Sequence, residues 1–302
     1  MKLTDVSEVI ESNNVLRLAL MMESVTQVGE ERESNAQQRN MYEILLFTIE
    51  RNMYECLAVL LGKLGNWFDW NEFGPSCLYF ACRGGFTESV RTLIEINSFE
   101  HSENTLALKA SIEYHQYGCL ELLVNSPVVA YSQDDLNEAL HIACEHDNSK
   151  ALLLLLKYDV DTNNKNRKGG SPLHTAIERG STECLRILLA KGTDLSVRNL
   201  IGLTPLHLAV KCQDSQASRL LLQKGANPNE QTRLGLTPLH YIATKENVNL
   251  LAILLHFGSD PSVCDNEGRT PVRLAHQKGL QANILLMTQY GANPINGGVL
   301  CK

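Results

Sequence analysis

The amino-acid sequence predicts an all-α protein built as a solenoid of helix pairs, and three observations support that fold class. Blocks of the form Ser/Thr-Pro-Leu-His begin 33 residues apart, at residues 171, 204 and 237, and a related block, Thr-Pro-Val-Arg, begins at residue 270. Each block is followed by an aliphatic run that ends near a glycine. Aromatic residues make up only 6% of the 302 residues although 44% are hydrophobic, which indicates many small cores rather than a single large one.

The first helix of each unit is predicted to begin at the proline of the block. Proline lacks the N–H that would be unpaired at that position anyway, and the preceding Ser or Thr is a favourable cap. A polar break and a second helix follow, as in the run from Cys184 to Leu189. Left-handed glycines are expected after the second helices, at Gly192, Gly225, Gly258 and Gly291, and in the turns, at Gly169, Gly202, Gly235 and Gly268. Such short amphipathic helices cannot bury their apolar faces alone, so the units must stack.

The Thr-Pro-Leu-His blocks at this period resemble ankyrin repeats. The resemblance implies units of a β-hairpin-like turn and two antiparallel helices, about eight repeats in all, with an N-terminal capping helix pair. Looser copies start at Glu43, Ser76 and Thr105, where the spacing is 33 and then 29 residues. The predicted organisation is capping helices and a polar loop at residues 1–42, three divergent repeats at 43–137, five well-matched repeats at 138–296 and a tail at 297–302.

Charge is unevenly distributed along the chain. The formal total is -7, but residues 1–136 carry -11 and residues 137–302 carry +4, which predicts that the protein does not present one uniform surface to its partners. No apolar run reaches the roughly 20 residues that a membrane span needs, and the N-terminus lacks the layout of a signal peptide. The nine cysteines form no Cys-x-x-Cys pair, which predicts reduced thiols. We therefore expect a cytoplasmic, or alternatively nuclear, protein without a membrane span.

Four histidines recur at the repeat period: His141, His174, His207 and His240. Repeats in such a stack advance by about 10 Å, the spacing of packed helices, so these side chains form a ladder and do not converge on a metal ion. In the family, the histidine forms hydrogen bonds between neighbouring repeats. No phosphate-binding loop, paired carboxylates or Ser-His-Asp arrangement stands out in the sequence. We predict no enzyme activity, and we expect no catalytic residue, metal, cofactor or small-molecule substrate.

Three other features leave alternatives open. The aromatic segment from Trp67 to Trp70, with Phe73, either covers the shortened repeats or forms a binding hot spot. Cys212 is either an ordinary exposed thiol or one whose pKa is lowered by the neighbouring lysine. Asn163 either belongs to an ordinary turn or resembles, in its spacing from upstream Leu and Asp residues, the asparagines that hydroxylases modify in ankyrin loops.

Ankyrin repeats bind protein partners along a groove formed by turn tips and first helices. Carried onto this sequence, the resemblance implies these partner-binding residues: Arg167, Lys168, Arg179, Leu200, Ile201, Leu203, Lys211, Arg233, Leu234, Leu236, Lys245 and Arg269. The five aliphatic residues among them predict an exposed apolar patch bordered by basic side chains.

We therefore expect a non-enzymatic protein-protein interaction module, acting as an adapter, scaffold or inhibitor, whose protein partner has an acidic and apolar surface. One alternative is a substrate-recognition subunit of a ubiquitin ligase, for which no recruiting box is visible in the sequence. Another is a nucleic-acid-associated regulator, which the net charge and the absence of interleaved aromatic and basic residues disfavour.

Overall fold

A computed structural model describes the following residues of the chain: 8–12, 15, 17–19, 21, 35–64, 68–96, 105–127, 129 and 131–293. They lie in helices, turns and connections, and no strand occurs among them, which confirms the predicted all-α class. None of the helices in these ranges combines the length and the hydropathy that a membrane span requires. The chain divides into two units, the first formed by Met1–Ile142 with Leu154–Tyr158 and the second by Ala143–Leu153 with Asp159–Lys302.

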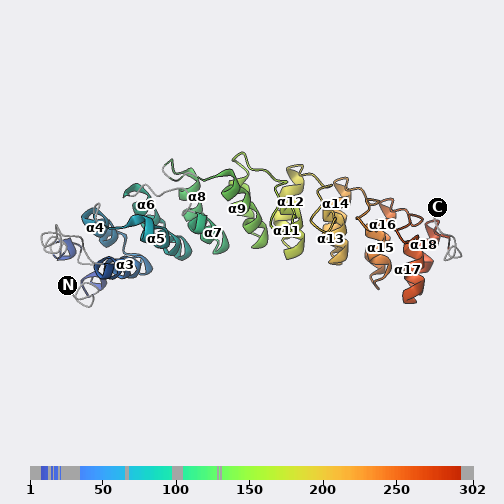
Figure 1. Cartoon of the computed structure of the whole chain (residues 1–302), viewed down its shortest axis with the longest axis horizontal. Helices are drawn as coiled ribbons and strands as arrows, with labels where there is room; N and C mark the ends of the chain where they lie inside the picture. Colours follow the sequence, from blue (N-terminus) through green and yellow to red (C-terminus); the bar gives the residue numbers. More distant parts are fainter. Residues whose placement is uncertain are drawn as a thin grey trace. The chain divides into compact units, whose positions relative to one another are not determined.

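The first unit consists of paired helices in two layers (Figure 1). The first helices of the pairs contact one another in the order α3 (Asn35–Glu50), α5 (Trp70–Gly84) and α7 (Thr105–Glu113). The second helices do the same in the order α4 (Tyr54–Leu64), α6 (Thr87–Ile96) and α8 (Tyr117–Asn125). The core of this unit runs from Val9 to Val129 and includes the fully buried side chains of Leu45, Leu57 and Leu78. Both units contain residues of α9 (Gln133–Glu145) and α10 (Ser149–Leu155).

The start of α3 differs from the expectation. It begins at Asn35, inside the segment that the sequence predicts to be a polar loop, and the predicted boundary after residue 42 falls within this helix. The stretch from Asn35 to Asn40 contains neither glycine nor proline, so it extends the helix whose apolar residues Met41, Ile44 and Leu45 are buried. Polarity alone therefore did not mark a loop here.

Part of the aromatic segment belongs to the core of the first unit. Phe68 and Phe73 are both buried, and their ring centroids lie 5.4 Å apart. Phe73 also packs against Tyr42, with centroids 4.9 Å apart. These contacts favour the core interpretation for the two phenylalanines, while Trp67 and the side chain of Trp70 lie outside the described part of the structure.

The second unit repeats one local plan. Its helices are α11 (Pro172–Arg179), α12 (Thr182–Ala190), α13 (Pro205–Lys211), α14 (Ser215–Gln223), α15 (Pro238–Ala243), α16 (Val248–His256), α17 (Pro271–Lys278) and α18 (Gln281–Gln289). The first helix of each pair starts at the predicted proline, and Thr204 and Thr270 accept a hydrogen bond from the third helical residue. The glycines predicted to follow the second helices take left-handed φ values, from 76° at Gly192 to 93° at Gly291.

Three buried histidines of the second unit each join their repeat to the next one. His174 Nδ1 accepts a hydrogen bond from the backbone N–H of Ser171 (3.2 Å), so its Nε2 carries the proton and donates to the carbonyl of Leu203 (3.0 Å). The same pair of contacts connects His207 to the Leu236 carbonyl at 3.1 Å and His240 to the Arg269 carbonyl at 3.0 Å. The histidines therefore link neighbouring repeats, as predicted.

The cysteines agree with the expectation of reduced thiols at all but one described position. Free thiols are found at Cys56, Cys77, Cys82, Cys119, Cys144, Cys184 and Cys212, and only Cys212 among these is exposed. Burial raises the pKa of Cys77 to about 12, so this thiol stays protonated and serves as a small core residue. Cys264 is disulfide-bonded, and the prediction of a reduced thiol is wrong there.

Candidate protein-binding surface

Each repeat of the second unit carries a tight five-residue turn ahead of its first helix. We call these turns, at residues 166–170, 199–203, 232–236 and 265–269, the turn tips. In the tip at 199–203, the Asn199 N–H donates to the Leu203 carbonyl (3.0 Å) and the Asn199 side chain accepts from the Leu203 N–H (2.9 Å). Leu200 and Ile201 lie between these residues, and their side chains take no part in closing the turn.

Neighbouring turn tips are held together by their backbones. The Leu200 N–H donates to the Lys168 carbonyl (3.2 Å), and the Asn266 N–H donates to the Leu234 carbonyl (3.1 Å). Gly169 permits the first of these contacts, because a Cβ at this position would lie 2.8 Å from Cγ of Leu200. Its φ of 69° is also unfavourable for other residues. The tips therefore form a row. In this row, the second residue of a tip packs against the glycine of the tip before it.

Three of the five aliphatic candidates are exposed on this row. Leu200 is 63% exposed, Ile201 62% and Leu234 67%. Ile201 and Leu234 hold the same position on consecutive tips, so the apolar surface continues from one repeat to the next.

The prediction of an exposed side chain is wrong for Leu203, which is only 2% exposed. Leu203 is the last residue of its tip, where the chain turns inward and its carbonyl accepts the hydrogen bond from His174. Leu236 occupies the equivalent position at the end of its tip and is half-buried, so it is less exposed than Leu234 on the same tip.

Ion pairs reduce the number of basic candidates. Lys168 Nζ lies 3.3 Å from the Glu178 carboxylate, and Arg179 pairs with Glu145. Arg269 is held inside its own tip by Asp265 (2.8 Å) and Glu267 (2.7 Å). Although burial alone would raise the pKa of Asp265, hydrogen bonds from Arg269 and Glu267 lower it, so the carboxylate stays charged. Arg269 therefore stabilises a turn tip instead of presenting a positive charge to a partner.

The other basic candidates surround the apolar row. Arg167 and Arg233 are exposed on the tips, while Lys211 and Lys245 are exposed at the ends of the first helices. The surface thus combines three aliphatic side chains with peripheral positive charge, whereas the last tip adds the acidic Glu267.

A comparison with protein-family models identifies this architecture. A model described as ankyrin repeats (3 copies) matches residues 140–232 and 206–296, which together make up just over half of the chain. The chain belongs to the ankyrin-repeat family. A comparison with curated proteins found no match. Ankyrin repeats are generally protein-protein interaction modules and are typically non-enzymatic.

The exposed thiol of this ankyrin stack is not an activated one. Partial burial and the negative charge of Glu178 raise the pKa of Cys212, and they outweigh the opposite effect of Lys211. A pKa lowered by the neighbouring lysine, one of the two interpretations of the sequence, is therefore wrong. Asn163 accepts a hydrogen bond from the Asp194 N–H (3.0 Å), a contact between ankyrin loops that leaves the hydroxylation alternative untested.

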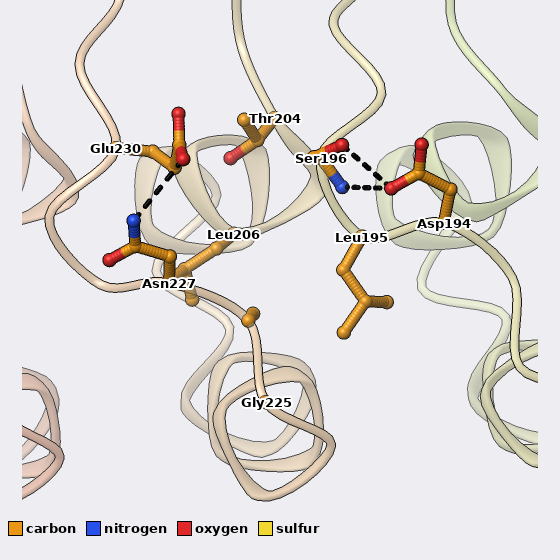
Figure 2. Close-up of a pocket in the computed structure, with 9 residues that line it drawn as sticks. Asp194, Leu195, Ser196, Thr204, Leu206, Gly225, Asn227 and Glu230 are labelled. Carbon is orange, nitrogen blue, oxygen red and sulfur yellow. Dashed lines mark hydrogen bonds between the residues drawn. The ribbon is translucent and has the colours of Figure 1, made fainter.

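A hollow of about 230 Å³ lies between the connections that follow α12 and α14 (Figure 2). Its acidic groups are already engaged, since Asp194 accepts from the backbone and the hydroxyl of Ser196 (2.8 and 2.7 Å) and Glu230 accepts from Asn227 (3.2 Å). The Ser196 hydrogen bonds lower the pKa of Asp194, so it is not suited to act as a general acid at neutral pH. Within the described ranges, no cluster of three or more His, Cys, Asp or Glu residues could hold a metal ion.

Arg198 is a supporting residue that the sequence analysis missed. Its guanidinium donates to the carbonyls of Gly202 (3.2 Å) and Gln231 (2.6 Å) and pairs with Glu230, so it joins one turn tip to the connection that leads into the next. The sequence offers one signal for this role, since Arg198 directly precedes Asn199, the residue that closes the tip. Arg198 therefore fixes the tip that carries Leu200 and Ile201.

Replacing Arg198 by Ala should lower the free energy of unfolding by about 1–2 kcal/mol, because two carbonyls and a carboxylate lose their shared donor. Urea denaturation of the full chain measures this change. Arg219→Ala is the matched control, since Arg219 is exposed on α14, and it should change stability by less than about 0.5 kcal/mol. Equal losses from both variants would contradict the supporting role of Arg198.

Proposed function

We propose that this ankyrin stack is an adapter, scaffold or inhibitor that binds a protein partner through the turn tips of its second unit. The observation that carries the proposal is the exposure of Leu200, Ile201 and Leu234, each more than 60% exposed on adjacent tips. Exposed aliphatic side chains that form one row lose their contact with water when a partner covers them, which favours association.

The partner is proposed to have an acidic border around an apolar centre. Arg167, Arg233 and Lys245 are exposed beside the aliphatic row, and Lys168 keeps most of its side chain exposed although it contacts Glu178. Charges at the border of an interface mainly orient the partner and speed association, whereas buried apolar side chains provide affinity. The two kinds of residue thus have separable effects on binding.

Quantitative affinity purification with the full chain as bait tests this function. The test bait carries Leu200→Ser, Ile201→Ser and Leu234→Ser. The control bait carries Leu153→Ser, Val248→Ser and Leu285→Ser, which replace three exposed aliphatic residues on second helices of the same unit. A direct partner should be retained by the wild type and the control bait and lost from the test bait. A protein set that is the same for all three baits would contradict binding through the tips.

A further inference from the structure

A second candidate surface lies in the first unit, on the side of the second helices. α6 and α8 border a groove of about 630 Å³, a size within the range of pockets that bind ligands. Ile94 and Leu122 provide its apolar floor, and Glu88, Glu95 and Glu121 lie along its rim. The three glutamates are exposed, whereas Ile94 is buried and Leu122 is half-buried.

One end of the groove is formed by Gly118, near the start of α8. Gly118 is the second residue of α8, where α12 has Glu183 and α14 has Gln216. A Cβ at Gly118 would lie 2.8 Å from Cγ2 of Thr87 on the facing helix. The absence of a side chain at Gly118 therefore lets α6 and α8 approach closely at this end of the groove.

The rim of the groove is negatively charged. Arg91 lies 3.4 Å from Glu88, so these two charges offset each other and the net charge of the lining comes from Glu95 and Glu121. Glu121 is the fifth residue of α8, a position at which α12 has Arg186 and α14 has Arg219. Two second helices of the other unit, α12 and α14, thus present positive charge where this groove presents a carboxylate.

We propose that the groove between α6 and α8 docks a basic segment of a protein partner, with an aliphatic side chain on Ile94 and Leu122 and flanking lysine or arginine residues at Glu95 and Glu121. The charge of the rim selects a basic segment, and the apolar floor requires an aliphatic residue within it. This segment has the opposite charge to the surface proposed to bind the turn tips, so the two sites recognise different chemistry.

Fluorescence anisotropy with the full chain tests the docking site. The probe is a short labelled peptide with leucines between paired lysines, and its companion has serine in place of every leucine. The leucine peptide should bind saturably and the serine peptide at least about tenfold more weakly. Glu95→Gln with Glu121→Gln should weaken binding of the leucine peptide about tenfold.

The matched control is Glu50→Gln with Glu113→Gln, which removes the same charge from exposed positions on α3 and α7. This control should leave binding unchanged, and circular dichroism melts should match the wild type for every variant. The proposal is overturned if the wild type does not bind the leucine peptide, if the serine peptide binds equally well, or if both glutamate pairs have the same effect.

Discussion

Replacing Leu200, Ile201 and Leu234 together by Ser should weaken binding of the partner at least about a hundredfold. Fully burying an aliphatic side chain is worth about 1.5–3 kcal/mol. Even about 1 kcal/mol from each of three side chains amounts to a factor of more than a hundred in Kd. Isothermal titration calorimetry with the partner retained by the wild-type bait measures this effect.

A charge variant separates affinity from orientation on the same surface. Gln at Arg167, Lys168, Arg233 and Lys245 should mainly slow association and flatten its dependence on salt, since a border charge pair contributes only about 0.2–1 kcal/mol. Stopped-flow association at several salt concentrations measures these rates. Native melting of both variants is the required control, and unchanged rates and affinity in both would show that the tips are not the binding surface.

Acid should destabilise the protein between about pH 6.5 and pH 4, before most carboxylates are protonated. Burial lowers the pKa of His207 from its ordinary value of 6.5 to about 4, and burial also lowers the pKa of His240. In this window the unfolded chain binds protons that the folded chain excludes, so stability falls as pH falls. His207 alone accounts for about 3 kcal/mol of this loss.

Urea denaturation of the full chain at pH values from 7.5 to 4.5 measures this dependence. His207→Ala should be less stable than the wild type at pH 7.5 by about 1–3 kcal/mol, and the difference should shrink as the pH falls. Asp194 and Asp265, whose pKa values are lowered from 3.8, lose their contribution only below this range. His276→Ala, at an exposed position on α17, is the control and should leave the pH dependence unchanged. Parallel curves for wild type and His207→Ala would contradict the prediction.

The parts of the fold that depend on local chemistry could be predicted from the sequence. Pro205 starts α13 because a missing N–H does no harm there, Thr204 caps it, and Gly225 follows α14 with a φ of 91°. These constraints act over a few residues, so the 33-residue period of the sequence is enough to locate the helix starts and ends. The resemblance to ankyrin repeats placed Leu200, Ile201 and Leu234 at turns, where their side chains are exposed.

Features that depend on contacts between repeats could not be predicted in this way. The burial of Leu203 follows from its position at the base of a tip whose carbonyl accepts from His174, 29 residues earlier. Arg179 looks like a free charge in the sequence, but its partner Glu145 lies on a different repeat. The groove between α6 and α8 is lined by residues of two different helices, such as Ile94 and Leu122, which only the stacking brings together. Each case involves residues brought together by stacking, which the order of residues along one repeat does not specify.

The closure of the turn tips depends on other groups than the side chains that we propose for binding. In the tip at 199–203, the backbone and Asn199 form the closing hydrogen bonds, whereas the side chains of Leu200 and Ile201 form none of them. Substitutions at these two positions can therefore accumulate during evolution without weakening the hydrogen bonds of the repeat. A new binding specificity can arise by exchanging two residues per tip, and an engineer can transplant such pairs between repeats while the framework stays the same.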